Sequence, residues 1–339
     1  MRILNVEGDY FVQSFRQLGH EVLTIGLEPG CDVIPGGVVS TRALWSILDE
    51  RGFRPDLALW CDLCRPPLVM GLETLPCVTA GYSIDQYVNP WHVPLSAGFD
   101  IFLVAQQDYL RLFLDQRLAH HVEWFPLFCD LEQDQDPGLE RDIPVSFVGT
   151  LNPPLNPLRR PFLKTFQRSA PIFLHQGDYR PVFARSRLVL NQSAVGELNF
   201  RLFQAMSCGA ALVTEACGNG LDDLFTPGED LYLYPRGDAA TAAALARQAL
   251  ASPRLEAVAK SGQRKTRALH SGLARARRIL SLAEALLRAG LPQWRRENAA
   301  LVREETARSY AMLAYDSELP LPGGLRSSYA EQAVRLSLA

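Results

Sequence analysis

Residues 199–215, NFRLFQAMSCGAALVTE, contain the pattern that decides the fold. Asn199 is a favoured residue at a helix N-cap, and Gly209 suits the position just after a helix. Three apolar side chains between them follow the helical period: Phe200, Phe203 and Met206. The next run, AALVT at 210–214, is continuously apolar, as strands are when helices cover both faces of a parallel sheet. The stretch therefore predicts a helix that leads into a buried parallel strand.

Arg201 lies in the first turn of this predicted helix, where a cation is unfavourable. The backbone N–H groups there already carry a partial positive charge, so an added cation needs an anion nearby. Two anions could serve: a diphosphate shared with the helix N–H groups, or the carboxylate of Glu197 across the turn. Because the helix follows the strand-like run RLVLN at 187–191, its start is expected at the carboxyl edge of a sheet.

The same alternation of apolar runs and helical segments occurs in both halves of the chain. The strands predicted in the first half are 2–6, 21–26, 56–60, 76–82 and 100–106, with helices at 11–18 and 41–51. Those of the second half are 145–150, 171–175, 187–191, 210–214 and 231–234, with helices at 239–251 and 257–289. This pattern predicts an α/β protein of two Rossmann-like, doubly wound domains that face each other across a cleft.

The acidic stretch DLEQDQDPGLERD at 130–142 has almost no apolar residues and predicts an exposed linker. The expected domains are an N-terminal domain at 1–130, a linker at 131–143, a C-terminal domain at 144–290 and a helical tail at 291–339. The tail has helical spacing over 291–315, interrupted at 320–324, and could pack back on the N-terminal domain.

The composition excludes several classes of protein. A formal net charge of −3 argues against a nucleic-acid partner, and no apolar run is long enough to span a bilayer. The first residues do not resemble a secretory leader, so a cytoplasmic protein is expected. Seven cysteines include one CxxC, Cys61 and Cys64. The pair could serve redox chemistry or a metal, or the thiols could pack as small apolar groups; no complete set of metal ligands accompanies them.

Two further loops could approach a phosphate at the same sheet edge. Gly218, Asn219 and Gly220 follow one predicted strand and precede a helix at about residue 221. Gly149 and Thr150 follow another strand and precede a proline-rich loop and Arg159–Arg160. Together with the helix start at Arg201, these loops predict a site for a nucleoside diphosphate.

Four segments of the second half resemble the donor-binding half of group 1 glycosyltransferases of the GT-B fold. They are VSFVGT (145–150), YRPVFARSRLVLN (179–191), LNFRLFQAMSCGAALVTE (198–215) and GLDDLFTPGEDLYLY (220–234). The closest similarity is to the subgroup named for CgeB spore-maturation proteins. Three segments of the first half fit that subgroup more loosely: SIDQYVNPWH (83–92), FDIFLVAQQDYLRLF (99–113) and WFPLFCD (124–130).

The resemblance implies a nucleotide-sugar donor, with a UDP-sugar expected, and neither a metal nor a separate cofactor. The donor-binding residues that it and the loops together indicate are Gly149, Thr150, Arg160, Asn191, Glu197, Asn199, Arg201, Gln204, Gly218, Asn219 and Gly220. Gln204 departs from the family, which usually has a Glu there that accepts hydrogen bonds from the donor ribose. An amide oxygen accepts less strongly than a carboxylate, so the change affects donor affinity or reflects a loss of catalysis.

Asp85 and His92 are the candidates for the general base that takes the proton of the acceptor. Both follow a predicted strand, and His92 lies between Pro90 and Pro94 on a loop expected to face the cleft. An Asx-turn is the alternative role for Asp85, and a structural hydrogen bond is the alternative for His92.

The function expected from these features is metal-independent transfer of a sugar from a nucleotide-sugar to an acceptor hydroxyl or other nucleophile. The acceptor could be a glycan, a protein or a small molecule, and the oligomeric state is open. Two alternatives remain: a catalytically silent nucleotide-sugar-binding partner protein, and a GT-B-fold nucleotide-sugar epimerase.

Overall fold

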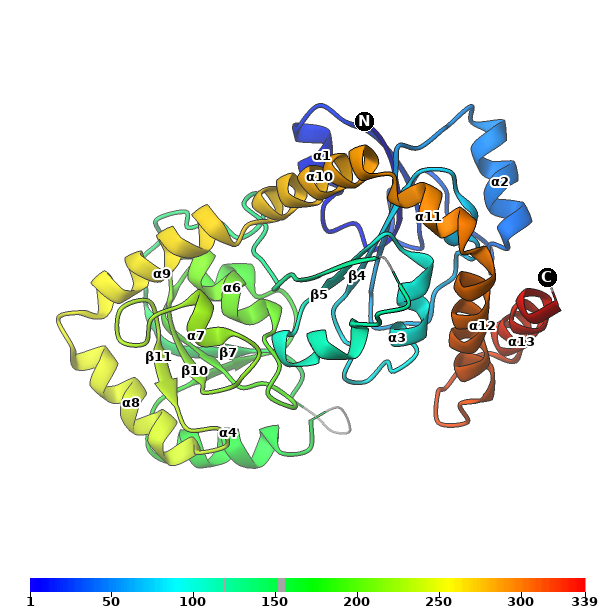
Figure 1. Ribbon diagram of the computed structural model, residues 1–339. Helices are drawn as coiled ribbons and strands as arrows, with labels where there is room; N and C mark the ends of the chain where they lie inside the picture. The colour runs from blue at the N-terminus through cyan, green and yellow to red at the C-terminus, as the bar shows by residue number, and fades with distance from the viewer. Residues whose placement is uncertain (119, 152–155, 339) are drawn as a thin grey trace. The chain divides into compact units, whose positions relative to one another are not determined.

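The computed structural model describes residues 1–118, 120–151 and 156–338, and it divides into two compact units (Figure 1). The first unit consists of Met1–Ala105, Tyr109–Phe125 and Ala276–Ala339. The second unit consists of Gln106–Asp108 and Pro126–Arg275. The proline-rich loop expected after Thr150 falls on residues 152–155, outside the described residues.

The first unit is built on a six-stranded parallel sheet in the order β2-β1-β3-β4-β5-β6. Its strands are β1 (Arg2–Glu7), β2 (Glu21–Ile25), β3 (Leu57–Cys61), β4 (Val78–Ser83), β5 (Ile101–Val104) and β6 (His121–Trp124). The helices of its N-terminal part are α1 (Val12–Gln17), α2 (Thr41–Glu50) and α3 (His92–Leu95). Since β2 and β3 lie on opposite sides of β1, the strand order reverses between β1 and β3, where α/β folds bind ligands.

The C-terminal helices of the chain complete the core of the first unit. They are α10 (Gly272–Ala289), α11 (Leu291–Glu297), α12 (Ala299–Tyr315) and α13 (Gly323–Leu338). Tyr310 of α12 and Tyr329 of α13 stack with ring centres 6.0 Å apart, and both side chains are buried in one cluster with Trp60. The sheet of the first unit therefore depends on residues from the far end of the chain.

A buried arginine fastens α11 to the sheet. Arg295 is 2% exposed, and its Nε and Nη2 each lie 3.1 Å from a carboxylate oxygen of Asp100. The same guanidinium donates to the backbone carbonyls of Glu73, Leu75 and Cys77. Every partner is a charged or carbonyl oxygen, so the cation is fully compensated in the interior.

The second unit has a five-stranded parallel sheet in the order β11-β10-β9-β7-β8. Its strands are β7 (Ile143–Val148), β8 (Phe173–His175), β9 (Ser186–Asn191), β10 (Ala211–Glu215) and β11 (Tyr232–Tyr234). Its helices are α4 (Arg159–Gln167), α5 (Arg180–Phe183), α6 (Phe200–Ser207), α7 (Leu221–Leu224), α8 (Ala239–Ala251) and α9 (Leu255–Leu269). The strand order reverses between β7 and β9. The two doubly wound parallel sheets predicted from the sequence are confirmed.

The acidic stretch expected as a linker lies within the second unit, and its one fully buried residue there is Asp134. Asp134 is 1% exposed, and the hydroxyl of Tyr179 donates to its carboxylate at 2.6 Å. Its backbone carbonyl accepts from Ser207 and Arg267. Most neighbouring side chains of this stretch are exposed, as expected, but the segment is tied to α6 and α9 through Asp134.

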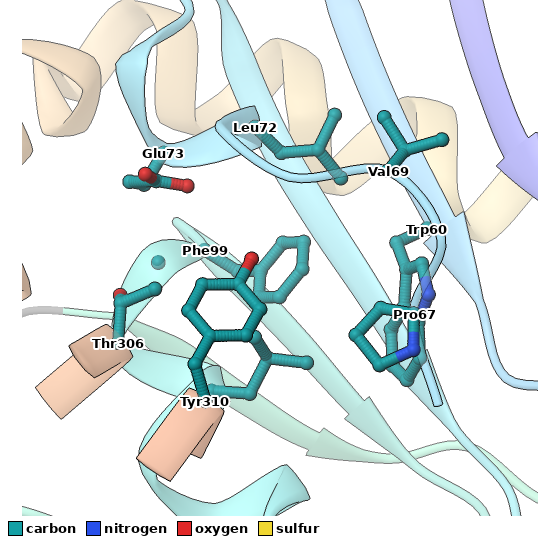
Figure 2. Close-up of a pocket in the computed structure, with 10 residues that line it drawn as sticks. Trp60, Pro67, Val69, Leu72, Glu73, Phe99, Thr306 and Tyr310 are labelled. Atoms are coloured by element: carbon teal, nitrogen blue, oxygen red, sulfur yellow. The ribbon is translucent and has the colours of Figure 1, made fainter. Parts of the chain in front are cut away.

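A small cavity lies between the sheet and α12 in the first unit, and Figure 2 shows the side chains around it. Its volume is about 20 Å³, enough for about one water molecule. Glu73 and Thr306 each direct into it a side-chain oxygen that has no hydrogen-bond partner among the described residues. The cavity is far too small for a nucleotide, so the site must be sought at the sheet edges.

Candidate active site

Arg201 spans the point in the second sheet where the strand order reverses. Its Nε donates to the carbonyl of Val148, the last residue of β7, at 2.7 Å. Its Nη1 donates to Oδ1 of Asn191, the last residue of β9, at 2.8 Å. The guanidinium also lies 4.5 Å from the centre of the Phe147 ring. The residue singled out by the sequence is thus held at the carboxyl edge where a ligand is expected.

No carboxylate within the described part of the chain forms an ion pair with Arg201. Glu197, the alternative partner, instead accepts from the backbone N–H groups of Ala194 and Val195 at 2.9 and 2.8 Å. Burial, followed by the charge of Arg159, lowers the pKa of Arg201 to about 9. A cation in such a place is electrostatically unfavourable until an anion joins it.

Arg159 is a second cation at this edge, and the sequence interpretation chose its neighbour Arg160. Arg159 is 8% exposed, and its Nη1 donates to the carbonyl of Thr150 at 2.9 Å. Its Nε donates to the side-chain oxygen of Gln192 at 2.9 Å. Arg160 is exposed. The helical period distinguishes the two arginines. Arg159 lies three residues before the buried Phe162 and therefore on the same, buried face of α4.

The start of α6 lacks the side-chain cap that the sequence predicted. Asn199 occupies the N-cap position with extended dihedral angles, but its side chain makes no capping hydrogen bond. Its Oδ1 is buried without a partner among the residues described. Gln204, one turn further along α6, is partly exposed. The first turn of α6 therefore keeps its capacity to bind an external anion.

The glycine-rich loop after β10, predicted to approach a phosphate, makes a hydrogen bond to the backbone that precedes α6. It leads into α7, a single turn whose start carries Asp222 and Asp223, and these charges already complement the helix dipole. Asn219, with a φ of 58°, is 5% exposed and donates from Nδ2 to the carbonyl of Gly196 at 2.9 Å. The loop thus supports the backbone that precedes α6.

The first loop of the second sheet needs its glycine for a steric reason. A Cβ atom at Gly149 would collide with Nη2 of Arg201. Thr150, the next residue, contributes its carbonyl to Arg159. Both predicted residues therefore lie beside Arg159 and Arg201.

A cavity of about 480 Å³ opens at the carboxyl edge of the same sheet. This volume is in the range of small-molecule sites. It is lined by Leu158, Pro161, Phe162, Thr165, Gln192, Ser193, Ala194, Glu215, Arg236, Gly237, Asp238, Ala239 and Ala240. Glu215, missed by sequence reasoning, is 2% exposed and accepts from the backbone and hydroxyl of Ser193.

Asp85 lies after β4, at the carboxyl edge of the first sheet. The hydroxyl of Tyr87 donates to its carboxylate at 2.8 Å. Burial, and then the charge of Asp62, raises the pKa of Asp85 above its ordinary value. A carboxylate that is partly accessible and holds its proton more tightly than usual has the properties of a general base.

His92 is in the interior and not on an open loop as expected. It is 0% exposed, and its ring lies against Trp60 and Trp91 with centres 5.4 and 4.1 Å away. Nδ1 is 2.8 Å from the hydroxyl of Ser83. Burial lowers the pKa of His92 to about 3. The ring is therefore neutral at physiological pH and too weak a base to accept a proton from an acceptor.

Two buried carboxylates at the strand reversal of the first sheet were missed by sequence reasoning. Asp62, just after β3, accepts from the backbone N–H groups of Cys64, Ile84 and Asp85. Glu7 ends β1 with a φ of 68° and accepts from the indole of Trp60 at 3.2 Å. Burial raises the pKa of Glu7 to about 7. The available signal was an acid at the carboxyl end of an apolar strand.

Possible metal ligands and the cysteines are distributed through the fold. The described residues contain no group of three or more His, Cys, Asp or Glu side chains placed to hold a metal. All seven cysteines are free thiols; Cys61 is buried and Cys64 exposed. Among residues 1–118, 120–151 and 156–338, no helix is both long enough and apolar enough to cross a membrane.

Comparison with known proteins connects these features to one fold. Residues 145–281 match the family model described as glycosyl transferase-like. Sucrose-phosphate synthase from Thermosynechococcus elongatus has a similar structure, at 14% identity and a TM-score of 0.62, over 85% of this chain and 100% of that one. The fold is that of GT-B glycosyltransferases. HepE from Anabaena, solved with UDP and glucose, matches at 12% identity and a TM-score of 0.61, over 84% of this chain and 100% of that one.

The GT-B architecture predicted from the sequence is therefore confirmed, and the family match falls on the unit that holds Arg201 and Arg159. A third GT-B structure, AviGT4, a glycosyltransferase involved in avilamycin A biosynthesis, matches at 14% identity and a TM-score of 0.56, over 85% of this chain and 98% of that one. The comparison with curated proteins gave no significant match. The expectation of a glycosyltransferase is confirmed at the level of fold and family match.

Proposed function

We propose that this GT-B protein transfers a sugar from a nucleoside-diphosphate-sugar to an acceptor without the help of a metal. The observation that carries the proposal is a pair of arginines, the buried Arg159 and the partly buried Arg201, neither of which is paired with a carboxylate in the described chain. A diphosphate at this edge would supply the missing negative charge. It would also accept hydrogen bonds from the uncapped start of α6.

The proposed donor is a UDP-sugar, supported by the UDP held in the similar structure of HepE. In the transfer, the bond between the sugar and the diphosphate breaks and negative charge builds up on the leaving diphosphate. Arg201 and the N–H groups of α6 would stabilise that charge in the role a metal has elsewhere. Membership of the CgeB-like subgroup and a cytoplasmic location stay predictions.

Asp85 is the proposed base, supported by its partial exposure and its raised pKa. The acceptor hydroxyl would give its proton to this carboxylate as it attacks the sugar carbon. His92 is the weaker candidate because it is buried and neutral. We therefore assign it a structural role beside Ser83.

Calorimetric titration with UDP, ADP and GDP in EDTA tests the donor site. At least one of the three is expected to bind the wild-type protein without a metal. Arg201→Ala should weaken that binding roughly 10- to 150-fold, the loss expected for a hydrogen bond to a charged group. Arg247→Ala, which removes an exposed arginine of α8, is the matched control and should bind as the wild type does.

Two results would contradict the donor proposal. One is a wild-type protein that binds none of the three nucleotides in EDTA. The other is unchanged affinity in Arg201→Ala together with lower stability, which would make the arginine a purely structural residue. Incubation with the matching nucleotide-sugar then separates transfer or hydrolysis from an epimerised donor and from binding alone.

Asp85→Asn is expected to lower turnover about a hundredfold or more, because an amide cannot accept the proton. Nucleotide affinity should stay the same, since the arginine site lies in the other unit. The acidic limb of the kcat/KM profile should also disappear, which a structural role for Asp85 would not explain. Glu50→Gln, at an exposed position of α2, is the control. Turnover near the wild-type value in Asp85→Asn would rule this base out.

A further inference from the structure

Residues 106–108 follow β5 in the chain but belong to the second unit, where they contact the loops at its carboxyl edge. Gln106 is 1% exposed and bonds to both polar groups of one backbone residue. Its Nε2 donates to the carbonyl of Leu198 at 2.8 Å, and its Oε1 accepts from the N–H of Leu198 at 2.9 Å. A side-chain amide used in this way fixes the position and the orientation of the backbone that it holds.

The backbone that Gln106 holds is the entry to α6. Leu198 is itself 1% exposed and directly precedes the N-cap residue Asn199. Arg201 lies three residues further on. The side chain of Asn199 does not cap the helix. The position of the residue before the N-cap is instead held by the two hydrogen bonds between Gln106 and Leu198.

The next two residues bind neighbouring parts of the same edge. The N–H of Asp108 donates to Oδ1 of Asn219 at 3.3 Å, and Asn219 in turn holds the carbonyl of Gly196. Gln107 donates to the carboxylate of Asp223 at 2.8 Å. Residues 106–108 therefore attach both to the loop before α6 and to the loop after β10, and Gln106 is the buried member of the set.

We propose that Gln106 is a positioning residue for the diphosphate site. By holding Leu198, it sets the first turn of α6 so that Arg201 and the helix N–H groups are in place before the anion arrives. Its contribution is pre-organisation, because a misplacement of about 1 Å at such a site can cost a hundredfold. The inference rests on the proposed function and adds a residue that touches neither the donor nor the acceptor.

The test is a double-mutant cycle on nucleotide affinity, with UDP as the probe. Gln106→Met keeps the size of the side chain and removes both hydrogen bonds, and it is expected to weaken UDP binding about tenfold. In the Arg201→Ala background the same change should cost less affinity, because one of the two groups that Gln106 positions is already gone and only the helix N–H groups remain. Gln248→Met, on the exposed surface of α8, is the control and should bind UDP as the wild type does.

The outcomes separate this inference from the proposed function. A wild-type protein that does not bind UDP refutes the UDP site and the inference with it. A wild type that binds UDP, with Gln106→Met binding equally well, refutes only the role of Gln106. Equal losses of affinity in both backgrounds would show that Gln106 acts on the fold and not through Arg201. Thermal unfolding of each variant identifies any protein that has failed to fold.

Discussion

Arg295→Ala is expected to lower the free energy of unfolding of the first unit by about 3–5 kcal/mol, the cost of breaking a buried ion pair from one side. The change leaves Asp100, which is 3% exposed, as an uncompensated buried charge. It also leaves the carbonyls of Glu73, Leu75 and Cys77 without the donor they share. Because these groups hold α11 to the sheet, α12 and α13 should lose protection from hydrogen exchange at the same time.

Denaturant unfolding followed by tryptophan fluorescence reports the stability of the first unit. All five tryptophans, Trp45, Trp60, Trp91, Trp124 and Trp294, are in the first unit. Arg296→Ala removes the exposed neighbouring arginine and should cost less than about 0.5 kcal/mol. The double change Arg295→Met with Asp100→Asn should recover part of the loss, since it removes both charges. A small loss in Arg295→Ala would mean that α11 is not fastened by this residue.

His92→Asn is expected to remove the acid destabilisation that this buried ring causes in the first unit. The pKa of His92 is about 3 in the fold against an ordinary value of 6.5, so below pH 6.5 the unfolded chain binds a proton that the folded chain does not. The contribution of His92 to the free energy of unfolding therefore falls as the pH falls through this window. At 1.36 kcal/mol per pH unit the loss is about 3 kcal/mol at pH 4 and approaches about 5 kcal/mol near pH 3.

The measurement is the difference in unfolding free energy between pH 7 and pH 4, again by tryptophan fluorescence. The variant should show a difference about 3 kcal/mol smaller than the wild type, although its stability at pH 7 is lower. His175→Asn, in the second unit, should leave the difference unchanged. An equal acid sensitivity in wild type and His92→Asn would show that the ring is accessible to protons in the folded state.

The sequence predicted the strands well because continuous apolar runs bounded by turns are a strong signal. The strand it missed, β6 at His121–Trp124, is half-buried along its length and carries polar and apolar residues in turn. Helix breaks were harder to predict. The expected helix at 257–289 is divided after Leu269, where the backbone of Cys129 pairs with that of His270 and Gly272. A contact with a residue so far away in the chain leaves no local pattern.

At the site, the sequence predicted the position of Arg201 correctly but not its surroundings. The dipole argument identified a cation in need of an anion, and the structure removed Glu197 as its partner. Arg159 was confused with Arg160 because adjacent identical residues differ only in which face of the helix they occupy. The burial of His92 could not be foreseen, because two prolines indicate a constrained loop and not the depth at which it lies.

The core of the first unit is formed from both ends of the chain, and this determines the order in which the two units can fold during synthesis on the ribosome. This core joins residues such as Val6 and Leu23 to Leu313 and Leu336. A nascent chain that has emerged only as far as the end of the second unit still lacks α12 and α13. The second unit, which is nearly continuous in sequence, can close while translation proceeds. The N-terminal part of the first unit must wait for α12 and α13, on the order of ten seconds or more, with part of its apolar surface exposed. It is therefore the part of the chain that most needs a chaperone.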